Sequence, residues 1–311
     1  MVTISCFSYK GGAGRTTLAM NVVPFLVREL GADEDHPLII ADMDVDSCGI
    51  TFFLNLEGWL NEDHNADNYT VQGMFGSNGT VPSDKYAESV KEHALFSHLA
   101  KVGEFFGYQK GTVLCVPAKP GGNLGINNNY DGKPDQIDKF VRECDEMDCA
   151  GILFDSAVGD QLTARWSNQF SSKIICCMRP TEQFREGTKR FFEKFDKELG
   201  NQKTIVVVPN VVPTDPLTIT DKDGTYAYPG YAKKKIKEAF ATNISDGFNN
   251  YDMTMVSEDF FGVPKIDRFM WHEGVLFTIL PKDLNDNERQ ALKCYEKIAK
   301  LLCKWEMKCL V

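Results

Sequence analysis

The chain has 311 residues, of which 43% are hydrophobic and 25% charged, and its formal net charge at pH 7 is −10. This composition is ordinary for a water-soluble globular protein, and the length allows one large α/β domain or two small ones. The negative charge argues against a protein coated all over with nucleic acid, although it allows a local basic patch.

The sequence carries no membrane, secretion or zinc signal. No apolar run approaches the ~20 residues of a membrane span. The N-terminus lacks the basic start and apolar stretch of a signal peptide, so we expect a cytoplasmic protein. The ten cysteines form no Cys-x-x-Cys pair and the five histidines are scattered, which favours reduced, buried thiols over metal ligands or disulfides.

Short apolar strands alternate with helices along the chain. The first strand spans residues 2–8, a Gly-rich loop follows, and residues 16–30 have helical spacing. Further strands are predicted at 37–44, 111–118, 150–155, 172–178, 203–210 and 274–280, and helices at 83–106, 135–147 and about 286–309. This order indicates a doubly wound, mostly parallel α/β sheet with helices on both faces.

No repeat or linker divides the sequence. We expect a single domain over residues 1–311, with variable regions at about 51–110 and 213–270. Within the second region, residues 215–240 and the stretch after them have the character of an insertion. Ligands of doubly wound folds bind at the carboxyl ends of the strands, so the residues that follow each strand are the functional candidates.

Residues 7–20, FSYKGGAGRTTLAM, have the composition of a phosphate-binding loop. Gly11, Gly12 and Gly14 let the backbone bend tightly and bring its N–H groups close to an anion at the positive end of a helix. The hydroxyl of Thr16 can bind the magnesium ion that accompanies a nucleotide. Strand, loop, hydroxyls and helix follow in the required order, which predicts a nucleotide site rather than a structural turn.

Acidic residues follow two of the predicted strands. Asp42, Asp44 and Asp46 come at the end of the second strand, and Asp155 ends the strand at 150–155, with Gly159 four residues later. Carboxylates at strand ends suit magnesium and an attacking water molecule. A solvated acidic turn is the alternative, and the direct attachment of these residues to buried strands argues against it.

The loop resembles the deviant Walker A motif of the ParA/MinD family of ATPases, Lys-Gly-Gly-x-Gly-Lys-Thr-Thr. The matching positions are Lys10, Gly11, Gly12, Gly14, Thr16 and Thr17, with Ala13 as the variable residue. Arg15 replaces the in-cis phosphate lysine, as in a KGGxGR subgroup of the family. The resemblance implies ATP and Mg²⁺ as cofactors and an ATP-dependent homodimer, in which Lys10 reaches the partner's nucleotide. Arginine is longer, planar and forked, so its phosphate contact differs from that of lysine and the rate of hydrolysis stays open.

The same resemblance assigns roles to the residues after the strands. Asp44 would orient the attacking water, so that Lys10, Arg15 and Asp44 form the catalytic set. Asp42 would belong to the magnesium shell, and Asp155 would hold magnesium through water. Asp46 and Gly159 would lie in the two nucleotide-sensing switch segments, and Asn210 and Pro281 would contact adenine.

Features of several subfamilies are missing. Residues 156–170 hold no cysteine to bridge an iron–sulfur cluster, and the sequence lacks both the Cys-x-x-Cys of cluster scaffolds and a C-terminal tyrosine cluster. Among the subfamilies that the resemblance allows, this leaves a nucleotide-driven switch.

The last predicted helix carries a stripe of lysines. At roughly 100° per residue, Lys293, Lys297, Lys300, Lys304 and Lys308 fall within about 80°, opposite Tyr295, Ile298, Leu302 and Trp305. The apolar side indicates core packing. The lysines are either a solvated face favoured by the helix dipole or a surface for DNA or anionic lipid, with a second patch at Lys233, Lys234, Lys235 and Lys237. Because packing hides the apolar side, DNA is favoured over a membrane.

The sequence therefore predicts a cytoplasmic, magnesium-dependent ATPase of the ParA/MinD type that dimerises around ATP and hydrolyses it slowly. Its partner would be non-specific DNA or a protein that regulates hydrolysis. One alternative is a non-hydrolysing nucleotide sensor, for example a regulatory subunit of a defence system. Another is an ATP-dependent amidotransferase or ligase on the same fold, for which no substrate pocket is evident.

Overall fold

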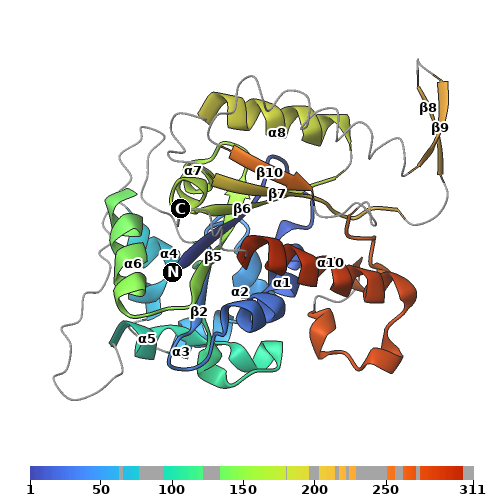
Figure 1. The fold of residues 1–311 in the computed structure, drawn as a ribbon. Coiled ribbons are helices and arrows are strands. Elements are labelled where there is room, and N and C mark those ends of the chain that lie inside the picture. The colour runs from blue at the N-terminus through green and yellow to red at the C-terminus, as the bar shows by residue number, and fades with distance from the viewer. Residues whose placement is uncertain are drawn as a thin grey trace, which may run out of the picture.

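The computed structural model describes residues 1–62, 66–76, 94–121, 134–179, 181–195, 203–213, 217–221, 224–228, 251–255, 262–270 and 274–303 (Figure 1). The strands of its main sheet are β1 (Val2–Ser8), β2 (Leu38–Asp42), β3 (Ala100–Lys101), β4 (Val113–Val116), β5 (Gly151–Val158), β6 (Lys173–Met178), β7 (Lys203–Pro209) and β10 (Tyr251–Met255). Their order in space is β10-β7-β6-β1-β5-β2-β4-β3. All neighbours are parallel except β3 and β4. The predicted doubly wound, mostly parallel sheet is confirmed.

Helices flank the sheet on both faces (Figure 1). The α-helices are α1 (Arg15–Leu30), α2 (Gly49–Phe53), α3 (Glu57–Glu62), α4 (Val71–Phe75), α5 (Ala94–His98), α6 (Pro134–Glu146), α7 (Leu162–Gln169), α8 (Glu182–Phe195) and α10 (Asp286–Cys303). Short 3₁₀ helices are η1 (Ala66–Tyr69), η2 (Gly103–Phe106), η3 (Lys110–Thr112), η4 (Asp267–Met270), η5 (Leu276–Thr278) and η6 (Pro281–Asp283). Helices α1 and α10 pack against each other.

Strand β2 shows why the apolar runs lack an alternating polar face. Leu38 and Ile40 belong to the core cluster that contains α1 and α10, whereas Ile39 and Ala41 belong to the cluster that contains α6. All four side chains are fully buried. A strand covered on both faces needs apolar residues at every position, which is the pattern seen in the sequence.

The end of β1 is fixed by packing against α8. Phe7 stacks on Phe191 with ring centroids 4.3 Å apart. The ring of Tyr9 lies against Gly187, where a Cβ would come within 2.1 Å of Tyr9 Cδ1. Glycine at this position therefore lets α8 lie directly beside the start of the Gly-rich loop.

The structure corrects the strand predicted at residues 274–280. This segment forms η5, and its backbone is held by a side chain of α1. The Leu276 N–H donates to Asn21 Oδ1 at 2.9 Å, and Asn21 Nδ2 donates to the Gly274 carbonyl at 3.1 Å. The edge of the sheet is instead formed by β10, which was not predicted and which pairs with β7.

Other predicted segments fall partly outside the described residues. Of residues 83–106 the structure describes 94–106, where α5 ends at His98 and β3 precedes η2. Helix α10 is described to Cys303, so Lys304, Trp305 and Lys308 lie outside, as do residues 229–250 with the second lysine patch. Strands β8 (Leu217–Asp221) and β9 (Gly224–Tyr228) form a hairpin separate from the main sheet (Figure 1).

Two further expectations concern membranes and thiols. In the described part of the chain, no helix is both long and apolar enough to cross a bilayer. The nine cysteines of that part are all free thiols, and eight of them are buried.

Candidate nucleotide site

The Gly-rich loop joins β1 to α1 in the shape of an anion cradle. Gly12 and Gly14 have φ values of 79° and 74°, in the left-handed region that favours glycine. Gly14 directly precedes α1, and no side chain caps that helix. Among the described residues, the backbone N–H groups of residues 14–17 donate no hydrogen bond. These free donors at the positive end of a helix form a site for a phosphate group.

Side chains at the ends of β6 and β7 contact the backbone carbonyls of the loop. Asn210 Nδ2 donates to the Ala13 carbonyl at 2.8 Å and to the Gly14 carbonyl at 3.2 Å. Arg179 Nε donates to the Gly12 carbonyl at 2.7 Å, and Cys177 Sγ lies 3.4 Å from the Ala13 carbonyl. Three successive loop carbonyls are thus bound, which fixes the loop without using its N–H groups.

Sequence reasoning missed the roles of Arg179 and Cys177. Both lie at the end of the predicted strand 172–178, where a polar residue is the signal that could have found them. The predicted contact of Asn210 with adenine stays a prediction, because Asn210 uses its Nδ2 on the loop and its Oδ1 forms no hydrogen bond within the described residues.

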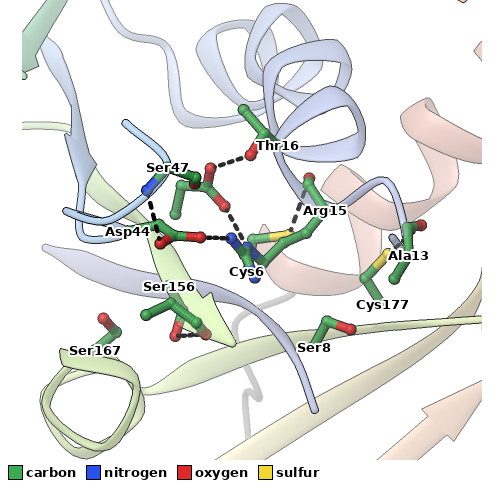
Figure 2. Close-up of polar contacts among 12 residues, drawn as sticks. Cys6, Ser8, Ala13, Arg15, Thr16, Asp44, Ser47, Ser156, Ser167 and Cys177 are labelled. Atoms are coloured by element: carbon green, nitrogen blue, oxygen red, sulfur yellow. Dashed lines mark hydrogen bonds and ion pairs between the residues drawn. The ribbon is translucent and has the colours of Figure 1, made fainter. Parts of the chain in front are cut away.

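Arg15 points away from the cradle, into a pair of carboxylates (Figure 2). Its Nη2 lies 2.5 Å from Asp44 Oδ2, and its Nε lies 2.9 Å from Asp155 Oδ1. The side chains of Arg15 and Asp44 are each 8% exposed, and that of Asp155 is fully buried. A phosphate contact through Nε or Nη2 of Arg15 requires that nitrogen to leave its acid.

Thr16 and Asp42 complete the acidic cluster. The Thr16 hydroxyl donates to Asp155 Oδ2 at 2.6 Å (Figure 2). Asp42 is paired with Asp155 across β2 and β5, and its Oδ2 accepts from the N–H and the hydroxyl of Thr51, both at 2.9 Å. Its Oδ1 is buried and has no partner within the described residues.

Burial sets the charge of this cluster. Burial and the neighbouring Asp155 raise the pKa of Asp42 to about 7. Burial also raises the pKa of Asp155, against the lowering effect of Arg15. Burial acts to lower the pKa of Arg15, but Asp155 and Asp44 outweigh it and raise the pKa above its usual value. Arg15 is therefore a permanent cation beside Asp44 and Asp155, whereas Asp42 is partly protonated at neutral pH.

The oxygen donors of the cluster fit magnesium in kind. Thr16, Asp155 and the unpartnered Oδ1 of Asp42 offer hydroxyl and carboxylate oxygens, which Mg²⁺ prefers. No group of three or more His, Cys, Asp or Glu side chains in the described ranges forms a metal cage by itself. Mg²⁺ usually takes only one or two protein carboxylates and completes its shell with water and phosphate oxygens, so these donors suit a nucleotide-bound ion.

Of the remaining predicted residues, Lys10, Asp46 and Pro281 are exposed and Gly159 is half-buried. Lys10 is exposed, and its Nζ donates to Gln183 Oε1 at 2.7 Å. Asp46 is exposed, and Gly159 has φ 65° with its N–H bonded to the Ser8 carbonyl at 3.2 Å. Pro281 begins η6 and is exposed. Their assigned roles stay predictions.

On α10 the apolar side is core and the lysine side faces outward. Tyr295, Ile298 and Leu302 are buried, as predicted. Lys293 and Lys300 are exposed, and Lys300 Nζ lies 2.8 Å from Glu296 Oε1. Part of the stripe is therefore neutralised within the helix.

Comparison with solved structures identifies the fold. Apo McdA from Cyanothece superposes with a TM-score of 0.63 at 13% identity, over 98% of this chain and 100% of that one. MinD in the MinC:MinD complex of Aquifex aeolicus gives 0.59 at 14% identity, over 100% and 99%. A ParA-family ATPase from Chlorobium tepidum gives 0.59 at 12% identity, over 96% and 98%. The fold is that of the ParA/MinD-type P-loop NTPases.

This result confirms the fold that the loop motif implied. No protein-family model matches the chain, and no curated protein matches it. At these low identities the likeness to MinD, McdA and ParA establishes the ParA/MinD-type fold, and the chemistry has to be argued from the site.

Proposed function

We propose that the protein is an ATPase of the ParA/MinD type that binds Mg-ATP and dimerises around it. The observation that carries this proposal is the loop, with free N–H groups at residues 14–17 and its carbonyls held by Arg179 and Asn210. Two proteins of the same fold support it: MinD from Pyrococcus horikoshii was solved with Mg-ADP and a McdA variant from Cyanothece with ATP.

Each residue of the site has a separate role in the proposed transfer of the γ-phosphoryl group to water. The loop N–H groups would hold the β- and γ-phosphates, and Thr16 and Asp155 would hold the metal ion, which would supply positive charge to neutralise the phosphates. Asp44 orients the attacking water once Arg15 has released it. Arg15 then turns to the phosphates, where its forked guanidinium binds two oxygens. The need to break two buried ion pairs first is consistent with slow hydrolysis.

We propose that Lys10 contacts the nucleotide of a second chain. The proposal is supported by its position before the glycines and by its exposed side chain, whose hydrogen-bond partner among the described residues is the exposed Gln183. A two-fold dimer would bring each Lys10 to the other chain's nucleotide, because such an interface is self-complementary. ATP, with its γ-phosphate, should then dimerise the protein, and ADP should do so poorly.

The experiment is light scattering with a slowly hydrolysed ATP analogue. Lys10→Ala should bind the analogue through the loop and Arg15, yet remain monomeric and fail to hydrolyse ATP. Lys194→Ala is the control, since Lys194 is an exposed lysine of the neighbouring α8 that pairs with Asp160 at 3.0 Å. Dimerisation of Lys10→Ala equal to that of the unmutated chain would remove Lys10 from the interface and with it this proposal.

The contact between Arg15 and Asp44 favours a second candidate, the non-hydrolysing nucleotide sensor. A carboxylate held at 2.5 Å by a buried guanidinium is not free to orient water. If Arg15 kept this contact in the ATP complex, binding and dimerisation alone would be the signal. Phosphate release by the unmutated protein that Asp44→Ala abolishes, with ATP binding retained, supports the enzyme; no turnover with or without DNA supports the sensor.

Two kinds of binding partner are supported, one by a solved relative and one by the exposed surface of α10. MinD of Aquifex aeolicus was solved with the protein MinC, and this chain could bind a regulatory protein in the same sense. The exposed lysines of α10 offer a second possibility, non-specific DNA, which binds through phosphate charge.

A further inference from the structure

The magnesium side of the site is closed by the protein's own side chains. Arg15 takes one oxygen of Asp44 and one of Asp155, and the Thr16 hydroxyl takes the other oxygen of Asp155 at 2.6 Å. The two carboxylates are nearly or fully buried, as is the guanidinium. Both oxygens of Asp155 and one oxygen of Asp44 are therefore already bound to an internal cation or an internal donor. The dashed lines from Arg15 and Thr16 in Figure 2 mark these contacts.

The turn after β2 covers the same place. The Asp44 carbonyl accepts from the N–H groups of Ser47 and Cys48 at 3.2 and 2.7 Å, so that Asp44 is part of a hydrogen-bonded turn leading into α2. At the start of α2, a Cβ on Gly49 would lie only 2.7 Å from Thr16 Oγ1. Glycine thus lets this turn close directly over the hydroxyl that would bind the metal.

Arginine is suited to this arrangement in a way that lysine is not. Two of its nitrogens, Nε and Nη2, bind separate carboxylates, whereas an ammonium group is a single point charge. A divalent ion placed beside the same acids would meet the guanidinium as a like charge. A phosphate in the adjacent loop, by contrast, would offer the guanidinium a new partner.

We infer that Arg15, held by Asp155 and the neighbouring Asp44, blocks the metal's place on Asp155 until a nucleotide phosphate draws it away, so that the divalent ion enters only with or after the nucleotide. The inference rests on the proposed nucleotide site and adds an order of binding to it. In the nucleotide-free protein, Arg15 thus keeps the acidic cluster from binding metal.

The test measures the Mn²⁺ and the AMPPNP that the full chain retains on ultrafiltration. The unmutated protein should retain Mn²⁺ only when AMPPNP is present. Arg15→Gln should retain Mn²⁺ without nucleotide, at least about tenfold more tightly than the unmutated protein, which corresponds to ~1.4 kcal/mol. Arg28→Gln is the control, because Arg28 lies on the same helix and also binds two carboxylates, Glu29 and Glu296.

A second variant covers the case in which Arg15→Gln does not fold. Arg15→Lys keeps the positive charge, but its single ammonium group cannot bind Asp44 and Asp155 through two separate nitrogens, so this variant should also retain more Mn²⁺ without nucleotide than the unmutated protein. Equal retention by the nucleotide-free unmutated protein and a folded Arg15→Gln would overturn the inference; if Arg15→Gln is unfolded by circular dichroism, the same comparison with Arg15→Lys decides. Loss of AMPPNP from the unmutated protein, with and without Mn²⁺, would instead overturn the proposed function.

Discussion

Asn210 shows how a single side chain prepares the loop for a nucleotide. Its amide binds two loop carbonyls and lies where a Cβ on Gly14 would come within 3.0 Å. Asn210→Ala should lower the free energy of unfolding by about 1–3 kcal/mol, because buried carbonyls lose their donor. The affinity for AMPPNP should fall several-fold, since the loop is less ordered before binding.

Denaturant unfolding and titration calorimetry measure the two effects of Asn210→Ala. Asn61→Ala, an exposed residue of α3, serves as the control and should change neither. An Asn210→Ala protein that binds AMPPNP as well as the unmutated chain would show that the loop keeps its shape without this clamp.

At the scale of residues, the sequence reveals the motifs but not which side chains pair with one another in the folded site. The glycines, Thr16 and the acids after β2 and β5 follow from a local pattern, because each stands at a fixed place in a strand–loop–helix unit. The pairing of Arg15 with Asp44 and Asp155 spans 29 and 140 residues. It depends on the side-chain conformation that the folded acidic cluster selects, which no spacing in the sequence reveals.

The lysines of helix α10 allow the proposed DNA-binding surface to be tested. Lys293 and Lys300 are exposed and Lys297 is half-buried, on the side away from the core. Replacing all three by glutamate should abolish ATP-dependent retention on DNA, and retention by the unmutated protein should fall steeply with salt, because each phosphate contact releases a counterion.

Filter binding measures this retention. The control reverses three exposed lysines outside α10 with the same change of net charge: Lys101, Lys110 and Lys119. Retention that survives the change on α10, or an unmutated protein that ignores DNA at ~50 mM salt, would leave the lysines as a solvated face.

At the scale of elements, buried parallel strands are predictable and the edges are not. Strands β1, β2 and β5 to β7 are mostly apolar and almost entirely buried, because both faces of the sheet are covered. The run at 274–280 has the same composition, yet Asn21 satisfies its backbone in place of a neighbouring strand. Strand β10, with the sequence YDMTM, lies at the edge next to β7, and its polar composition gives no such signal.

For the whole molecule, buried thiols determine how stability changes at alkaline pH. Burial raises the pKa of eight cysteines above the usual 9.0: Cys6, Cys48, Cys115, Cys144, Cys176, Cys177, Cys294 and Cys303. Above pH ~9 the unfolded chain loses these protons while the folded chain keeps them, so stability should fall as pH rises toward the folded pKa values. Those values include about 11 for Cys294 and about 12 for Cys48 and Cys177.

Lys203 changes the stability at alkaline pH in the opposite direction. Burial lowers its pKa to about 8, so this residue by itself adds stability between pH 8 and its unfolded pKa of 10.5. One lysine opposes eight thiols, and the thiols should dominate. The melting temperature, followed under reducing conditions from pH 7 to about pH 11, should therefore decline above pH ~9; a constant or rising melting temperature would contradict this assignment.

The central claim, that the loop binds a nucleotide together with magnesium, is tested most directly by thermal unfolding with Mg-ATP. A ligand that binds only the folded state stabilises it by about 2.7 kcal/mol at a hundredfold excess over Kd, so the melting temperature should rise by several degrees. Thr16→Ala should keep the response to ATP but lose most of its dependence on magnesium. An unchanged melting temperature of the unmutated protein at millimolar Mg-ATP would contradict the account.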